Sequence, residues 1–119
     1  MGTFISWVEI PAKDLHRAVA FYNAALQTNL TISDFGQEKM AGFPNGEGAI
    51  TQAPDFNPSQ DGVIVSFNAG KDIDGVIDRI HSAGGKIITG KTKIEAEGMG
   101  YFALFIDTEG NRMGLYGEV

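Results

Sequence analysis

The two halves of this 119-residue chain follow the same plan. A strand-like run leads into an amphipathic helix that starts at Asp14, and a second such pair follows at Asp72, 58 residues later. About three short β-prone runs come after each helix. A unit of one helix and four strands leaves one sheet face uncovered, so two units are expected to complete each other. The sequence therefore predicts an α+β protein that forms one domain over residues 1–119, with modules over 1–58 and 59–119.

The element pattern rests on hydrophobic periodicity and on turn residues. Asp14 is a plausible N-cap, and apolar residues recur at helical spacing after it and after Asp72. Gly84 and Gly85 close the second helix, and Asn45-Gly46 is a hairpin signal. The predicted helices span 14–26 and 72–83, and the predicted strands span 4–10, 30–33, 39–43, 48–51, 63–68, 86–89, 101–106 and 112–116. Residues 52–61 link the modules, and 91–100 form a polar loop flexible enough to act as a lid.

Composition narrows the classes of function. The formal net charge is −6, and the nine Lys and Arg residues are scattered, which argues against a nucleic-acid partner. The chain has no cysteine, so thiolate metal sites and disulfides are excluded. No signal peptide is evident, and no apolar run reaches the roughly 20 residues that cross a bilayer. A cytoplasmic protein without membrane contact is the resulting interpretation.

Three segments resemble the vicinal oxygen chelate superfamily, which contains glyoxalase I, bleomycin-resistance proteins and extradiol dioxygenases. The segments are Trp7–Asp14 followed by Arg17-Ala18 and Phe21-Tyr22, the helix-to-strand junction 83–87, and the ending Phe105–Tyr116. Thr108 stands where the family's closing signature has proline. The resemblance implies paired βαβββ modules that curl into a U-shaped, partly open barrel. It also implies a homodimer and a small-molecule ligand or substrate in the groove between modules.

Metal-dependent members of that family take His or Glu ligands from four strand positions. Carried over to this chain, the positions fall on Trp7, at or next to Thr51, near Ile64 and on Gly114. None of these residues is a normal ligand for zinc, nickel or iron. The two histidines, His16 and His81, both lie in predicted helices, which pack on the convex side of the sheet in this fold. No metal and no other cofactor is therefore predicted.

The groove is expected to be amphipathic instead. Because side chains alternate along a strand, Glu9 shares a face with Trp7, and Arg112 shares one with Gly114 and Tyr116. The predicted ligand-binding residues are Trp7, Thr51, Arg112, Gly114 and Tyr116, with aromatic walls from Phe43 and 101–105. Trp7 would either stack on a flat ligand or fill the space of a missing metal.

Glu9 is the candidate catalytic residue. Removed from water beside an indole, its carboxylate would act as a general base next to a carbonyl. It would alternatively pair with Arg112 or with backbone donors and only hold strands together. Three functions stay open: a metal-free binding protein for a small, partly aromatic or carbonyl-containing molecule, a metal-independent lyase or isomerase, and a surface that only binds a partner protein. No nucleotide-binding glycine loop or catalytic triad is evident.

Overall fold

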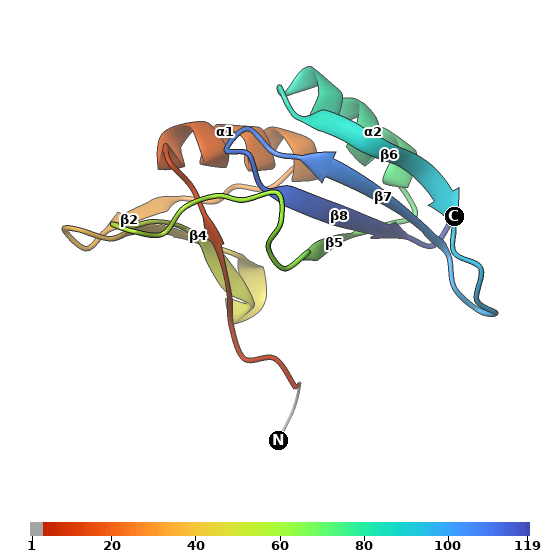
Figure 1. Ribbon diagram of the computed structural model, residues 1–119, viewed down its shortest axis with the longest axis horizontal. Helices are drawn as coiled ribbons and strands as arrows, with labels where there is room; N and C mark the ends of the chain where they lie inside the picture. Colours follow the sequence, from red (N-terminus) through yellow and green to blue (C-terminus); the bar gives the residue numbers. More distant parts are fainter. Residues whose placement is uncertain (1–3) are drawn as a thin grey trace.

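The structure is a computed structural model that describes residues 4–119 (Figure 1). Each half contains one helix and four strands in the order strand, helix and three strands, which confirms the duplicated plan. The first half contains β1 (Val8–Pro11), α1 (Leu15–Leu26), β2 (Ile32–Asp34), β3 (Lys39–Gly42), a short 3-10 turn (Pro44–Gly46) and β4 (Gly48–Gln52). The second half contains β5 (Ser66–Gly70), α2 (Ile73–Ser82), β6 (Lys86–Lys93), β7 (Tyr101–Ile106) and β8 (Arg112–Gly117).

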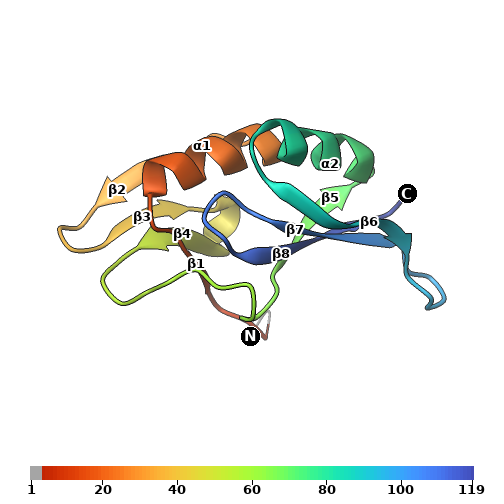
Figure 2. The ribbon, with the colours of Figure 1, turned by 45° about the horizontal axis from the view of Figure 1, so that its top comes forward.

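The two halves have equivalent sheets. The strand orders are β1-β4-β3-β2 and β5-β8-β7-β6, so the first and last strands of each half are neighbours. These neighbours run parallel and the other pairs run antiparallel. Both helices lie on one side of the two sheets (Figure 2). The two mixed sheets are not closed into a barrel, and the α+β fold of paired βαβββ modules is confirmed.

Helix α1 begins and ends as the sequence predicts. The carboxylate of Asp14 accepts a hydrogen bond from the Arg17 N–H at 3.2 Å, which is the N-cap interaction. Gln27 ends the helix in the left-handed region, with φ of 54°. In α2 the N-cap residue Asp72 makes no side-chain cap bond, and Gly84 follows the helix with φ of 102°. Glycine adopts that conformation without steric cost.

The core lies between the helices and the sheets and continues from one half into the other. Phe21 of α1 packs against Phe105 of β7, with ring centroids 6.2 Å apart. Tyr22 packs against Phe67 of β5 at 5.4 Å. The stripe of α1 that the sequence predicts is largely buried, at Leu15, Ala18, Val19, Tyr22 and Ala25. Burial of these apolar faces is the main stabilising contribution that joins the modules.

Two predicted strands begin several residues later than expected, and β2, which was expected at 30–33, spans Ile32–Asp34. The first was expected at 4–10 but starts at Val8, because pairing with β4 begins at Val8 opposite Gly48. The predicted stop at Pro11 is nearly right, since Pro11 is the last strand residue. The fifth strand was expected at 63–68 but spans Ser66–Gly70, where it pairs with β8. Apolar residues before each strand made both runs look longer than the pairing allows.

The predicted polar loop 91–100 is partly a strand. β6 continues to Lys93 and pairs with β7. The remaining loop is closed by a hydrogen bond from the Ile94 N–H to the Gly100 carbonyl at 3.0 Å and by Lys93 Nζ, which donates to the Met99 carbonyl at 2.7 Å. It projects from the end of the β6–β7 hairpin (Figure 1) and is no part of the cavities described below. Within residues 4–119, neither helix has the length and apolar character of a membrane span.

Candidate functional site

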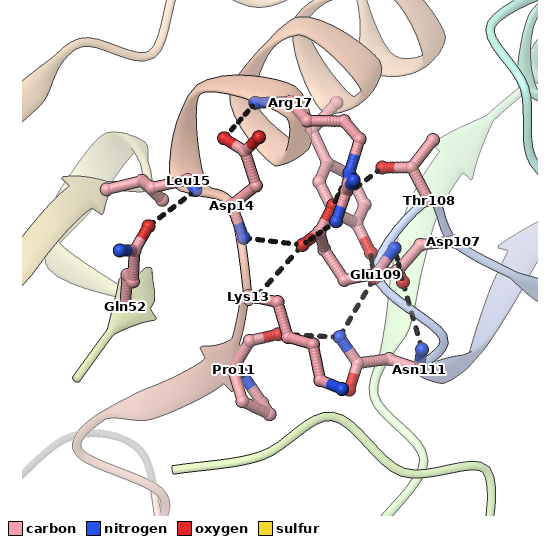
Figure 3. Close-up of polar contacts among 11 residues, drawn as sticks. Pro11, Lys13, Asp14, Leu15, Arg17, Gln52, Asp107, Thr108, Glu109 and Asn111 are labelled. Carbon is pink, nitrogen blue, oxygen red and sulfur yellow. Dashed lines mark hydrogen bonds and ion pairs between the residues drawn. The ribbon is translucent and has the colours of Figure 1, made fainter. Parts of the chain in front are cut away.

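A turn of the second half forms hydrogen bonds with the start of α1 in the first half. This turn, residues 107–111, connects β7 to β8 (Figure 3). Oε1 of Glu109 accepts hydrogen bonds from the N–H groups of Lys13 and Asp14, at 2.9 and 2.8 Å. Arg17 donates to both carboxylate oxygens, from Nε to Oε2 at 2.7 Å and from Nη2 to Oε1 at 3.0 Å. The fork of a guanidinium matches a carboxylate in this two-bond arrangement.

The Glu109 carboxylate is completely buried, whereas about half of the Arg17 side chain is exposed. Burial alone would raise the pKa of Glu109. The hydrogen bond from Arg17, the backbone hydrogen bonds from Asp14 and Lys13 and the charge of Arg17 outweigh burial and lower that pKa. The hydrogen bond to Glu109, with its negative charge, raises the pKa of Arg17. Glu109 is therefore held as a buried anion at the junction of the modules.

A second buried chain of hydrogen bonds extends the contact. The Tyr22 hydroxyl donates to Oδ2 of Asp107 at 2.6 Å, and Asp107 Oδ1 accepts from the N–H groups of Glu109 and Asn111 at 2.9 Å each. The Asn111 amide nitrogen donates to the carbonyl of Pro11, at the end of β1, at 2.8 Å. Burial, followed by the charge and hydrogen bond of Asp107, raises the pKa of Tyr22 well above its usual value. The turn thus fixes β1 relative to β8.

The same turn holds the linker between modules. Oδ1 of Asn111 accepts from the Ser59 N–H at 3.3 Å, and the Ser59 carbonyl accepts from the Arg112 N–H at 3.3 Å. The sequence analysis did not single out Glu109, Asn111 or Tyr22 as contact residues, so it missed this network. The available signal was the density of carboxylate and amide groups in a five-residue turn, which exceeds what a turn needs.

The contacts place two charged residues around one cavity. A cavity of about 330 Å³ lies between β1, the linker and the start of β8. This is the lower end of the usual size of small-molecule sites. Its lining comes from both modules and comprises Val8, Glu9, Ile10, Pro11, Asn57, Ser59, Gly62, Val63, Val65, Asn111, Arg112 and Met113. Glu9 and Arg112, two residues that the sequence singles out, therefore face a common space.

Glu9 and Arg112 do not neutralise each other. Within residues 4–119, no ion pair of 4.0 Å or less joins them. Glu9 is exposed and accepts one hydrogen bond, from the Thr51 hydroxyl to Oε1 at 3.0 Å. Arg112 is half-buried, and its Nε is buried without a hydrogen-bond partner in the described part of the chain. The alternative in which Glu9 pairs with Arg112 is thus not observed, and Glu9 is not removed from water.

Comparison with known proteins identifies the family of the chain. Residues 4–115 match the family model of the Glyoxalase/Bleomycin resistance protein/Dioxygenase superfamily. The chain belongs to this superfamily. No curated protein matches the sequence significantly.

Solved structures share the fold of this superfamily member at low sequence identity. An antibiotic binding protein, TnmS3 from Streptomyces sp. CB03234, is 18% identical with a TM-score of 0.67, over 98% of this chain and 97% of that one. A glyoxalase-related enzyme from Fulvimarina pelagi is 11% identical with a TM-score of 0.69, over 95% and 86%. A glyoxalase I mutant from Zea mays is 21% identical with a TM-score of 0.70, over 94% of this chain but 46% of that one. At these identities the likeness shows the fold alone.

The other predicted ligand-binding residues are more dispersed. Thr51 is buried and contacts Glu9, but Trp7, Gly114 and Tyr116 are not among the residues that line the cavity. Trp7 lies just before β1 and is 47% exposed. Gly114 leaves space that Ser66 Oγ occupies, and the Tyr116 hydroxyl accepts from the Gly100 N–H at 3.1 Å. The structure therefore brings Glu9 and Arg112 to one cavity, and Thr51 donates a hydrogen bond to Glu9 but does not line that cavity.

The residues present do not suit the metal site of metal-dependent superfamily members. At the four corresponding positions, Trp7, Ile64 and Gly114 offer no side-chain metal ligand, and the Thr51 hydroxyl donates a hydrogen bond to Glu9. No group of three or more His, Cys, Asp or Glu residues suited to a metal occurs within residues 4–119. His16 and His81 are exposed and lie on the helices. No chemical step is therefore assigned to a metal.

Proposed function

We propose that this superfamily member binds a small, partly aromatic or carbonyl-containing molecule in the groove between its modules, without a metal. The observation that carries the proposal is Arg112, whose buried Nε has no partner in the described chain and which lines the cavity with Glu9. A buried donor without a partner costs free energy, and a ligand oxygen that accepts from it removes this cost. The ligand would therefore carry an acceptor such as a carboxylate or a keto oxygen.

The rest of the cavity supports an amphipathic ligand. Val8, Ile10, Val65 and Met113 supply apolar wall, which suits an aromatic or alkyl body. Asn57 and Ser59 add polar groups at the linker. The antibiotic binding protein from Streptomyces, which shares the fold, supports a binding role for a chain of this architecture. We infer that an aromatic α-keto acid such as phenylpyruvate has the required combination of groups.

A thermal-shift experiment tests this proposal. Protein treated with EDTA is mixed with phenylpyruvate, and the melting temperature is expected to rise with ligand concentration. The Arg112→Gln variant should lose most of this rise, whereas Lys86→Gln, which removes an exposed cation of β6, should retain it. An equal rise in the wild type and in Arg112→Gln would contradict the proposal.

A metal-independent lyase or isomerase that acts on a carbonyl compound is the second candidate function. It is favoured by Oε2 of Glu9, which has no hydrogen-bond partner within residues 4–119 and belongs to a residue that lines the cavity. A carboxylate in this position could take a proton from the carbon next to a keto group. Exchange of the phenylpyruvate methylene protons in deuterated water, followed by NMR, should then be accelerated by the wild type and not by Glu9→Gln. Equal exchange rates would remove the role of Glu9 as base.

We further propose that the protein is a homodimer and resides in the cytoplasm. Several apolar side chains are exposed, including Phe4, Trp7, Val63 and Ile64, and Val63 lines the cavity. Such a patch is typical of an interaction surface. Sedimentation of dilute protein should give twice the mass of 12.7 kDa, and Trp7→Ser should shift the equilibrium toward the monomer. A single 12.7 kDa species at micromolar concentration would contradict the dimer.

A further inference from the structure

A larger cavity also has walls from both modules. Its volume is about 610 Å³, and its walls come from the end of α1, the turn before β4, β5 and the start of α2. Val8 and Val65 line both this cavity and the smaller one, so the two adjoin. Glu9, Thr51 and Arg112 are not part of the larger cavity. A volume of this size is typical of sites for small molecules.

The walls of this cavity are apolar and aromatic. Phe43 and Phe67 meet edge to face, with centroids 6.0 Å apart and an angle of 77° between their planes. Leu26, Leu30 and Val76 complete the apolar surface. An aromatic ring can pack against such a corner in the offset or edge-to-face geometry that aromatic pairs prefer. The interior therefore favours a ligand with a flat apolar body.

Charged groups of the lining favour a positive ligand. Arg79 is already engaged, because its Nε donates to the Ala25 carbonyl at 3.1 Å and its Nη2 lies 3.4 Å from Asp72 Oδ2. Helix α1 has no basic residue in its last turn, so Arg79 compensates the partial negative charge at the end of that helix. Glu47 is exposed, and its carboxylate has no partner within residues 4–119. One negative charge is left without compensation.

We propose that this cavity is a second binding site, which takes an apolar, ring-containing amine. The ring lies against Phe43 and Phe67, and the ammonium group pairs with Glu47 at the rim. This inference is independent of the proposed function, because it uses neither Arg112 nor Glu9. The net negative charge of the chain also raises the local concentration of such cations.

Tryptamine tests the proposal, with indole-3-propionate as an anion of the same ring system. Amide resonances are followed by NMR in the full chain during titration. Tryptamine is expected to shift the resonances of Phe67, Asn68 and Ala69 on β5, and indole-3-propionate to bind at least tenfold more weakly. Shifts confined to Glu9 and Arg112 would place the ligand in the smaller cavity, and equal affinities for the two compounds would remove the charge preference. Either result would overturn the proposal.

Variants separate this site from the first one. Glu47→Gln should weaken tryptamine binding about threefold, as expected for an exposed ion pair, whereas Glu38→Gln, an exposed carboxylate beyond the cavity lining, should not. Val76→Phe and Leu26→Trp add side-chain volume within the lining and should abolish binding. If both of these variants misfold, Glu47→Gln and the resonance map still decide.

Arg112→Gln distinguishes failure of this site from failure of the proposed function. It should reduce phenylpyruvate binding and leave tryptamine binding unchanged. Loss of tryptamine binding in Arg112→Gln would show that the two ligands share one site and would overturn the inference. If a second copy of the chain filled this cavity, the wild type would show no resonance shifts with tryptamine, and Val76→Phe would have a lower oligomeric mass than the wild type. That pair of results would overturn the inference.

Discussion

The Glu109 carboxylate lies 2.7 Å from the Arg17 guanidinium, although the two residues belong to opposite modules (Figure 3). The same carboxylate accepts from two backbone N–H groups at the start of α1. It is fully buried, so these bonds replace the water that it loses on folding. The relative position of β1 and β8, and hence of Glu9 and Arg112, depends on this contact and on Asn111.

Replacement of Glu109 by glutamine is therefore expected to destabilise the protein. The amide keeps nearly the same shape but loses the charge that pairs with Arg17, and its NH2 group must oppose either the Arg17 Nε–H or the two backbone N–H donors. We expect a loss of about 2 kcal/mol in the free energy of unfolding, measured by urea denaturation. Glu97→Gln, at an exposed loop position, is the matched control and should change this free energy little. A Glu109→Gln variant as stable as the wild type would show that the contact does not hold the modules together.

Stability should also fall in acid because of Glu109. The pKa of this residue is lowered in the folded protein, since its hydrogen bonds and Arg17 outweigh the effect of burial. Its contribution is therefore fully present above the pKa of the unfolded chain, about 4.3, and is lost as pH falls toward the folded-state value. Urea midpoints at pH 6 and pH 3.5 measure this difference, which should be smaller in Glu109→Gln. The same pH dependence in both proteins would assign the acid sensitivity to other carboxylates.

Tyr22→Phe tests the buried hydrogen bond to Asp107. The variant loses a 2.6 Å bond and leaves a buried carboxylate oxygen with one donor fewer. We expect the free energy of unfolding, measured by urea denaturation, to fall by about 1.5–3 kcal/mol, the range for hydrogen bonds to charged groups.

An alkaline titration supplies an independent readout for Tyr22. Because the pKa of Tyr22 is raised in the folded state, its contribution is present below the usual value of about 10 and is lost as pH rises above it. Of the three tyrosines, one should ionise only when the protein unfolds, as followed by ultraviolet absorbance. Ionisation of all three in the folded protein at an ordinary value would contradict the buried bond.

Gly48→Ala tests the close approach of β1 to β4. A Cβ at Gly48 would collide with the carbonyl group of Val8, which is backbone and cannot turn away. We expect the free energy of unfolding to fall by about 1–3 kcal/mol, as for overpacked sites. Glu9 should also be displaced, and ligand binding should be weaker. Gly42→Ala on β3 is the control, since its Cβ would meet nothing within 4 Å. Equal thermal stability of the two variants would contradict the close approach of β1 to β4.

Most of the fold could be predicted from local patterns of capping residues and apolar spacing. Asp14 caps α1, and its apolar stripe is buried where helical spacing puts it. The strand starts could not be predicted as well, since Val8 and Ser66 begin their strands where a partner strand is available rather than where apolar residues start. Pairing partners are distant in sequence, so composition alone does not locate these ends.

The candidate site could be predicted only in part. Glu9 and Arg112 were identified because they share strand faces with Trp7 and Gly114, two positions that the family resemblance puts in the groove. Their lack of contact depends on the spacing between β1 and β8, which the buried bonds of Glu109 and Asn111 set. Those bonds join residues about 100 positions apart, and a single sequence gives no direct signal for such contacts.

Calorimetric titration of phenylpyruvate into EDTA-treated protein, with and without added Zn²⁺, tests the central claim most directly. The account predicts the same dissociation constant under both conditions, because Arg112 rather than a metal binds the ligand oxygen. Binding that appears only after Zn²⁺ is added would contradict it.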